Sequence, residues 1–254
     1  MGSFDDEFHT LALSEDGSYT AYSKEYDEHY HSTKDGALHE SLVKHVIPAI
    51  TLKAHQSQIN ILDICFGLGF NTLATLYYCE RNNVNAKLNI YSPELDAKLI
   101  SSLVNFRYPK EFEPFVDIIK NLVKDGVHKS NSFNIELFVG DAREYIESIQ
   151  NIRFDIVYQD AFSPSSNPIL WTKEYFADIA SLMKIDGVLT TYSTALKTRL
   201  ALYENDFNLY INSGEDFRDA TLASLSELTH LKKVDIVHKI SCNPHVNSLR
   251  DSMI

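Results

Sequence analysis

Residues 157–172, which read VYQDAFSPSSNPILWT, carry the pattern that decides the fold of this 254-residue chain. The apolar residues before Asp160 predict a buried strand, and the proline and asparagine residues between 164 and 168 predict a stiff loop after it. Trp171 then opens an amphipathic helix. An acid that follows a buried strand into such a loop stands where open α/β sheets place their binding sites.

Strand-like and helix-like segments alternate on both sides of this stretch. Strands are expected at residues 59–65, 86–94, 134–142, 153–160, 186–194 and 207–213, with a candidate seventh at 234–242. Helices are expected at residues 36–50, 67–80, 95–105, 143–150, 173–184 and 195–205. This alternation predicts an α/β fold with a parallel, doubly wound sheet.

The chain is expected to have two parts. Residues 1–50 predict an N-terminal extension, with a β-hairpin in the Tyr-rich stretch 18–26 followed by a helix from Gly36. Residues 51–254 predict a Rossmann-like domain with a helical insertion at about 105–131.

The net charge of −12 argues against a general nucleic-acid binder. Much of the charge is local, because residues 1–40 hold ten acids and two lysines, a balance of −8. The insertion, in contrast, holds a group of basic residues that suits either an RNA-facing surface or a solvated helix face: Arg107, Lys110, Lys120, Lys124 and Lys129.

Three scattered cysteines, Cys65, Cys79 and Cys242, lack metal-ligand spacing, so we expect no metal. The first two fall in apolar patterns and are expected to be buried thiols. The sequence has no run of eighteen apolar residues and no signal peptide, which predicts a cytoplasmic protein without a membrane anchor.

The first strand runs into LDICFGLGFN, residues 62–71. Gly67 and Gly69 permit a tight turn and the close approach of a ligand to the backbone. The turn is not a dinucleotide fingerprint, because Thr72 stands where G-x-G-x-x-G needs its last glycine. It better suits a nucleoside with a charged amino-acid tail, such as S-adenosylmethionine, although two glycines also serve many turns for geometry alone.

Acids follow three further strands, and all of them should meet at one edge of the sheet. Glu94 can accept two hydrogen bonds from ribose hydroxyls, or be an ordinary solvated carboxylate. Asp141 can accept from an adenine amino group, cap the helix that begins at Ala142, or do both. Asp160 is the candidate contact for the reacting group. Four strand ends with suitable residues are a stronger signal than any one of them.

At this point the chain resembles a known family, the methyltransferase half of the tRNA 5-methylaminomethyl-2-thiouridine biosynthesis protein MnmC and its stand-alone relatives. The matching segments are YHSTKDGALHES (30–41), CFGLGFNTL (65–73), YSPELD (91–96), LFVGDARE (137–144), DAFSPSSNPILWT (160–172) and GVLTTYSTA (187–195). The resemblance implies a class I S-adenosylmethionine-dependent methyltransferase. The substrate it implies is the 5-aminomethyl group on the wobble uridine of tRNA.

The resemblance also implies roles for particular residues. The cofactor-binding residues it implies are Asp63, Phe66, Gly67, Gly69, Asn71, Glu94, Asp141 and Asp160. Asp160 is also the implied catalytic residue, which faces the reacting amine. Phe162 and Trp171 are candidates to stack the uracil, and Ser32 and Glu40 belong to a family motif and are further candidate substrate contacts.

The chain departs from the family pattern in three places. Cys65 stands where the family has the first glycine of its turn, and the segment after Gly214 is acidic where the family is basic. No second dinucleotide-type glycine motif follows, so no FAD-dependent oxidase domain is expected in this chain, and the protein should act only on a free amine. Two alternatives stay open: an N-methyltransferase of small-molecule or protein amines, and a cofactor-binding relative without catalysis.

Overall fold

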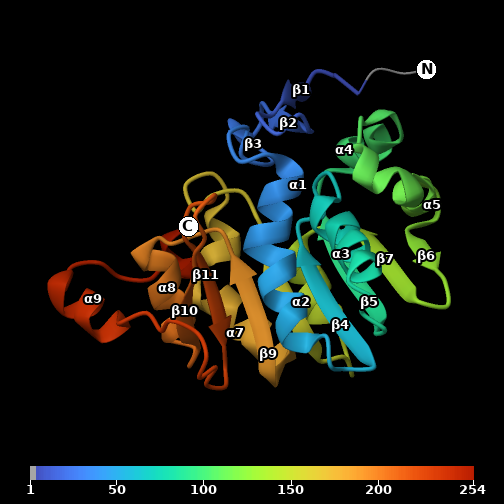
Figure 1. Ribbon diagram of the computed structural model, residues 1–254. Coiled ribbons are helices and arrows are strands. Elements are labelled where there is room, and N and C mark those ends of the chain that lie inside the picture. Colours follow the sequence, from blue (N-terminus) through green and yellow to red (C-terminus); the bar gives the residue numbers. More distant parts are fainter. Residues whose placement is uncertain (1–3) are drawn as a thin grey trace.

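A computed structural model describes residues 4–254 and places an eight-stranded sheet between two layers of helices (Figure 1). The strand order is β10-β11-β9-β8-β4-β5-β7-β6. The strands are β4 (Gln58–Ile64), β5 (Lys87–Glu94), β6 (Val127–Lys129), β7 (Phe133–Val139), β8 (Phe154–Gln159), β9 (Met183–Thr191), β10 (Asn208–Asn212) and β11 (Ala220–Ser224).

The middle of the sheet is parallel and both of its edges are antiparallel. β4 lies between β5 and β8, and the parallel pairing extends to β7 on one side and β9 on the other. β6 pairs antiparallel with β7, and β11 pairs antiparallel with both β9 and β10. The expected sheet was parallel, and that part of the prediction is wrong at the edges, where short connections join β6 to β7 and β10 to β11 as antiparallel neighbours.

Helices cover both faces of the sheet, and each face has its own apolar core. The helices are α3 (Phe70–Arg81), α4 (Ala97–Ser102), α5 (Val116–Asp125), α6 (Ala142–Ser148), α7 (Lys173–Leu182), α8 (Leu196–Tyr203) and α9 (Ile236–Cys242), with short 3₁₀ turns at Leu103–Asn105, Lys110–Phe115, Pro168–Trp171 and Asp251–Met253. One core holds residues of α3 and α5, and the other holds residues of α6, α7 and α8. Alternate residues of the buried strands supply both cores.

The N-terminal residues form a second, three-stranded antiparallel sheet, which lies beyond the end of the main sheet in Figure 1. Its strands are β1 (His9–Leu13), β2 (Tyr19–Ser23) and β3 (Glu28–His29). The helix expected from Gly36 follows as one run of three parts: α1 (Ala37–Glu40), a π-helical turn (Ser41–Val46) and α2 (Ile47–Lys53). The π turn was not predicted, and such turns often occur at functional sites because the extra residue redirects side chains.

Three other segments differ from the sequence prediction. Residues 234–242 are not a strand but helix α9, whose N-terminus is capped by Asp235 accepting from the His238 amide at 2.9 Å. Strand β11 was not predicted, because the segment after Gly214 was interpreted only from its acidic residues. All five residues of β11 are buried. The insertion is helical as expected, but it ends in strand β6. No helix within residues 4–254 is long and apolar enough to cross a membrane.

Candidate cofactor and substrate site

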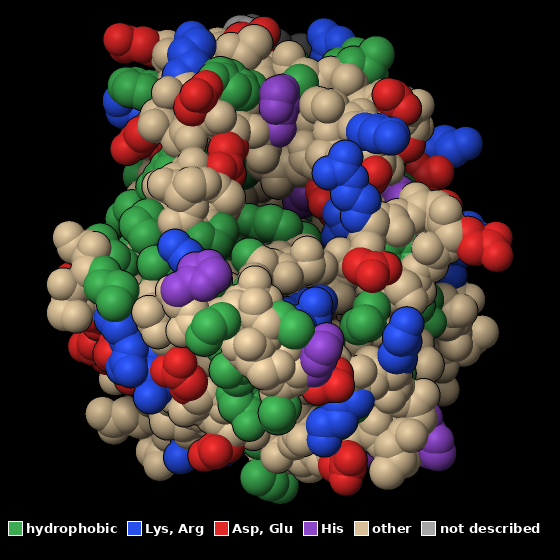
Figure 2. Space-filling view, turned by 90° about the vertical axis from the view of Figure 1, so that its left-hand side faces the viewer, with side chains coloured by type: hydrophobic (Ala, Val, Ile, Leu, Met, Phe, Trp, Pro, Cys, Tyr) green, Lys and Arg blue, Asp and Glu red, His purple; other side chains and the backbone are tan. Residues whose placement is uncertain are grey.

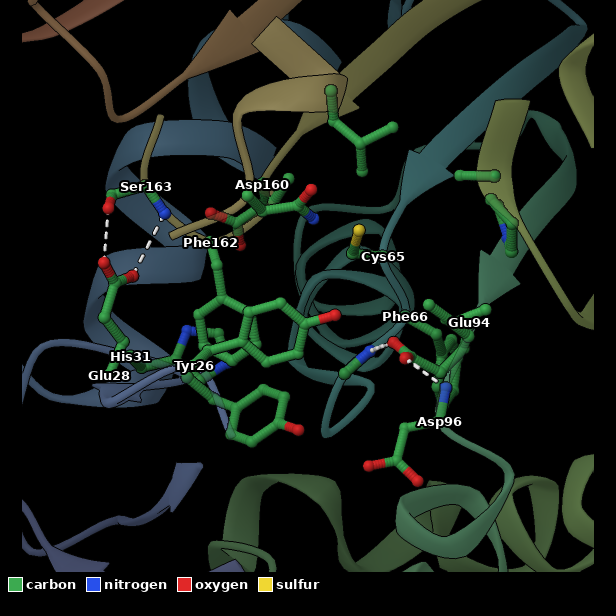
Figure 3. A pocket seen from close by; sticks show the side chains of 18 of the residues that line it. Tyr26, Glu28, His31, Cys65, Phe66, Glu94, Asp96, Asp160, Phe162 and Ser163 are labelled. Atoms are coloured by element: carbon green, nitrogen blue, oxygen red, sulfur yellow. Dashed lines mark hydrogen bonds between the residues drawn. The ribbon is translucent and has the colours of Figure 1, made fainter. Parts of the chain in front are cut away.

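A cavity of about 770 Å³ opens at the carboxyl ends of the parallel strands, beneath the N-terminal sheet. This volume is in the usual range for a small-molecule or cofactor site. Its lining includes nine of the candidate residues: Ser32, Glu40, Phe66, Gly67, Asn71, Glu94, Asp141, Asp160 and Phe162. Figure 3 shows Glu94 and Asp96 at one end and His31, Asp160 and Phe162 at the other.

The turn after β4 brings the backbone to the cavity wall. Three of its residues have positive φ, namely Cys65 at 65°, Gly67 at 55° and Gly69 at 80°. Gly69 is the N-cap of α3 and does not line the cavity itself. A Cβ on Gly69 would lie 2.8 Å from the Phe66 ring, so glycine is needed there for packing as well as for φ.

Glu94, at the end of β5, is tied to this turn. Its Oε2 accepts from the Gly67 amide at 2.8 Å and its Oε1 accepts from the Asp96 amide at 2.9 Å (Figure 3). Burial raises the pKa of Glu94, and the backbone amides oppose that shift. Each carboxylate oxygen has a second lone pair, so a fixed and preoriented carboxylate remains able to accept from two neighbouring hydroxyls.

Asp141 has the geometry of a cap and also lines the cavity. Its Oδ1 accepts from the Arg143 amide at 2.7 Å and from the Glu144 amide at 3.2 Å, at the start of α6. The capping role that the sequence left open is therefore present. Because Asp141 and Ala142 both line the cavity, the residue stays a candidate for an adenine contact as well.

Asp160, just after β8, is held by side chains from two distant elements, helix α3 and the π turn. Its Oδ2 accepts from Asn71 Nδ2 at 2.8 Å, and its Oδ1 lies 3.3 Å from His45 Nε2. His45 is fully buried in the π turn, and its Nδ1 lies 3.0 Å from the Thr190 hydroxyl. Burial alone would raise the pKa of Asp160, but His45, His31 and Asn71 outweigh it and lower the pKa well below its usual value. Asp160 is therefore a carboxylate at neutral pH.

The loop after Asp160 is fastened to the N-terminal sheet. Glu28 accepts from the Ser163 amide at 3.0 Å, from the Ser163 hydroxyl, and from the Ser166 hydroxyl at 2.7 Å. Beside this contact the Tyr26 and Phe162 rings stack with centroids 4.5 Å apart (Figure 3). Two segments far apart in sequence thus close one side of the cavity.

The structure corrects two of the expected roles. Trp171 is fully buried and does not line the cavity, and its indole N–H donates to the Phe162 carbonyl at 2.8 Å. It supports the loop that carries Phe162 and does not face a ligand. Asp63 is also buried outside the cavity, where its Oδ2 accepts from the Thr72 hydroxyl at 2.7 Å and burial raises its pKa to about 7.

Ser32 and Glu40 meet on the cavity wall. The Ser32 amide donates to Glu40 Oε2 at 2.7 Å, and Lys44 Nζ donates to Glu40 Oε1 at 2.6 Å. Lys44 also reaches Asp35 at 3.2 Å. This buried network joins the segment before α1 to the π turn, so these two residues hold the wall in shape.

Sequence reasoning missed four residues of this site: Tyr26, Glu28, His31 and His45. His45 had a weak local signal, since it lies within the apolar pattern of the helix from Gly36 and is a polar residue at a buried position.

Of the three thiols, Cys79 is buried as expected, Cys65 is partly exposed and lines the cavity, and Cys242 is exposed. Within residues 4–254 no cluster of three or more His, Cys, Asp or Glu side chains has the arrangement of a metal site.

Comparison with known proteins agrees with this geometry. Residues 113–226 match a family described as S-adenosyl-L-methionine-dependent methyltransferase. An uncharacterized protein of Methanocaldococcus jannaschii is 35% identical over 204 residues, which cover 79% of this chain and 55% of that protein. The tRNA 5-methylaminomethyl-2-thiouridine biosynthesis bifunctional protein MnmC of Azoarcus sp. (strain BH72) is 30% identical over 213 residues, covering 79% of this chain and 33% of that protein. The chain therefore spans about half of the first relative and a third of the second.

The fold gives the same relationship. The crystal structure of MNMC2 from Aquifex aeolicus superposes with a TM-score of 0.86 and 29% sequence identity, covering 99% of this chain and 81% of that one. A spermidine synthase from Thermotoga maritima shares the fold at a TM-score of 0.52 and 14% identity, covering 89% of this chain and 72% of that one. By its matched family segment, its sequence relatives and its fold, this chain belongs to the S-adenosyl-L-methionine-dependent methyltransferases, in the group that includes the methyltransferase domain of MnmC.

Proposed function

We propose that this chain transfers the methyl group of S-adenosylmethionine to the primary amine of 5-aminomethyluridine, with or without 2-thiolation, at the wobble position of tRNA. The observation that carries the proposal is the Asp160 carboxylate, which lines the cavity and is kept ionised by His45 and Asn71. A fixed carboxylate in a cavity is suited to bind an ammonium group. The MnmC relatives supply the identity of the amine, and a tRNA substrate implies a cytoplasmic location.

The residues present fit the cofactor. Glu94 offers two preoriented acceptors for the ribose hydroxyls, and Asp141 stands where an adenine amino group can donate to it. Asn71 Oδ1 is a buried oxygen without a partner among the described residues, and Asn71 lines the cavity, so this oxygen can accept from the amino group of the methionine part. When bound, the cofactor supplies an activated methyl group on a sulfonium.

The task of this chain is then mainly alignment. Because the departing sulfur is neutral, the transfer needs little acid catalysis, and rate comes from holding the amine in line and excluding water. Asp160 orients the amine, while Phe162 offers a ring on which the uracil can stack once it has left the anticodon stack. A flat base needs the Tyr26–Phe162 stack to open or to rearrange, since those rings are already in contact.

The surface charge also suits a second candidate function, that of an N-methyltransferase of small-molecule or protein amines. In Figure 2 acidic and basic side chains are interspersed over the face shown, which is not a basic surface. In the insertion, Lys120 pairs with Asp117 at 2.7 Å and Lys124 lies 3.8 Å from Asp125. Steep salt dependence of substrate binding favours tRNA, and a flat dependence favours a small amine.

The test is transfer of labelled methyl groups into bulk tRNA from a strain that lacks this modification, followed by nucleoside mass analysis. A 5-methylaminomethyluridine product supports the proposal. The variant Asp160→Asn keeps the shape of the side chain and removes its charge, so we expect turnover to fall by about 30-fold or more, because a buried charged contact is worth roughly 2–5 kcal/mol. Near-normal turnover by Asp160→Asn, with an unchanged circular dichroism spectrum, would contradict the role of Asp160.

A further inference from the structure

An alkylammonium cannot attack a methyl group until it loses a proton. Alkyl amines such as the lysine side chain titrate at about 10, so the substrate arrives protonated at neutral pH. Asp160 is a poor acceptor for that proton, because its pKa is lowered well below the usual value. A second group is therefore needed at the same end of the cavity.

The other acids at this end are already engaged. Glu40 accepts from Lys44 and from the Ser32 amide. Glu28 accepts from the two serines of the loop after Asp160. Removing either carboxylate from these contacts to take a proton would leave charged or polar partners without an acceptor, which is costly in a buried setting.

His31 is different, because it lines the cavity and neither of its ring nitrogens is used in a hydrogen bond within the described residues. Its backbone amide donates to the Thr20 hydroxyl at 3.1 Å, and its ring meets the Phe70 ring edge-on with centroids 5.0 Å apart. Within the described residues its ring nitrogens have no hydrogen-bond partner; Glu40 Oε2 lies 3.8 Å from Nδ1, which is too far. Figure 3 places His31 on the same side of the cavity as Asp160.

The surroundings of His31 favour a neutral ring, and they also stabilise the imidazolium that forms when the ring gains a proton. Burial has the largest effect and lowers the pKa of His31, so the free imidazole predominates at neutral pH. Asp160 and Glu40 oppose this shift, and His45 and Lys44 add to it. Of these charged groups Asp160 has the largest influence, so the carboxylate that binds the substrate also stabilises an imidazolium on His31.

We propose that His31 is the catalytic base, which removes a proton from the substrate ammonium while Asp160 holds that group in place. The inference rests on the proposed function, because it needs an amine substrate. One N–H bond of the ammonium breaks, its electron pair stays on nitrogen, and a ring nitrogen of His31 gains the proton. The freed lone pair is the pair that would form the new bond to the methyl carbon, while the methyl–sulfur bond of the donor would break and leave its electron pair on a neutral sulfur. The methylated nitrogen would then carry the positive charge, and His31 would return its proton to water.

Kinetics of His31→Gln test the proposal, with His55→Gln as the control because His55 is exposed on the turn after α2. We expect turnover at pH 7 to fall by about 100- to 10,000-fold, the usual contribution of a general base. The defect should shrink as the pH approaches about 10, where the substrate arrives as a free amine. Imidazole added to His31→Ala should restore part of the activity. An equal defect at both pH values, without rescue, would show a merely structural role.

An NMR titration gives a readout that does not depend on turnover. With histidine labelled at the ring and S-adenosylhomocysteine present, the His31 signal should be that of a neutral ring at pH 7. It should shift to the imidazolium position when 5-aminomethyluridine is added, and Asp160→Asn should weaken that shift. A ring that stays neutral with the nucleoside bound would refute the proposal. Wild-type protein that methylates no tRNA would refute the proposed function instead, and this titration would still decide whether His31 accepts a proton from the amine.

Discussion

Glu28 provides the sharpest test of how the cavity is closed. Its carboxylate accepts three hydrogen bonds from Ser163 and Ser166, which lie 135 and 138 residues further along the chain. Hydrogen bonds to charged groups contribute roughly 1.5–3 kcal/mol each when buried. Glu28 is only half-buried and both serine hydroxyls can turn to water, so about 1 kcal/mol each is a better estimate.

The change Glu28→Ala should therefore cost about 2–3 kcal/mol in the stability of this contact. That corresponds to a roughly 30- to 150-fold rise in its opening equilibrium. The Ser163 amide donates directly to Glu28, so amide hydrogen exchange at Ser163 reports the opening at one atom. We expect its exchange to accelerate by that factor, and the KM for substrate to change while the two apolar cores stay intact.

The matched control is Glu25→Gln, which removes the same charge three residues earlier, at an exposed position with no bond or ion pair among the described residues. A double-mutant cycle with Ser166→Ala separates the direct contact from general charge effects, and a coupling free energy of about 0.5–1.5 kcal/mol is expected. If Ser163 exchange were the same in wild type, Glu28→Ala and Glu25→Gln, the loop would be held by packing alone and the reasoning would be wrong.

Two further predictions concern the cofactor end of the cavity and the N-terminal sheet. Glu94→Gln should weaken S-adenosylmethionine binding by about tenfold or more in calorimetry. The new side-chain NH₂ group would point at the backbone N–H of Gly67 or Asp96, so that two donors would meet where a carboxylate oxygen now accepts. Unchanged affinity would show that Glu94 does not bind the cofactor. Burial lowers the pKa of His9, but hydrogen bonds to Asp96 and Asp6 outweigh it and raise the pKa. That stabilisation is complete below about pH 6.5 and is lost as the pH rises through the folded-state value. The melting temperature of His9→Gln should therefore lie furthest below wild type near pH 6, with the gap narrowing by pH 9, and a constant gap would count against the charged pair.

The parts of the fold that sequence reasoning found are those with a local cause. Buried parallel strands leave continuous apolar runs, and the residue after each run is fixed at one edge of the sheet, so Glu94, Asp141 and Asp160 could be placed together without coordinates. Strand β11 and helix α9 had no such clear signal. Both are short, and a run of mixed apolar and polar residues fits either periodicity.

The residues that were missed depend on contacts between distant segments. His45 matters because the π turn aims it at Asp160 and at Thr190, which lies 145 residues away. Glu28 matters because the N-terminal sheet folds back over the loop after β8. No period or spacing in the sequence encodes either contact. Trp171 shows the converse error, since an aromatic residue beside a site was assigned to the ligand when its ring is needed to pack the loop.

Cys65, as a departure from the family pattern, favours the alternative that this chain binds the cofactor without catalysis. The surroundings of Cys65 argue against that alternative. The residue has a φ of 65°, a conformation that favours glycine and costs other residues roughly 1–3 kcal/mol. A thiolate beside an activated methyl group would itself be a methyl acceptor. Burial, followed by the charges of Glu94 and Asp160, raises the pKa of the Cys65 thiol well above its ordinary value. The carboxylates that suit this cavity to a nucleoside and an amine therefore also keep Cys65 protonated and inert, so its presence is compatible with methyl transfer.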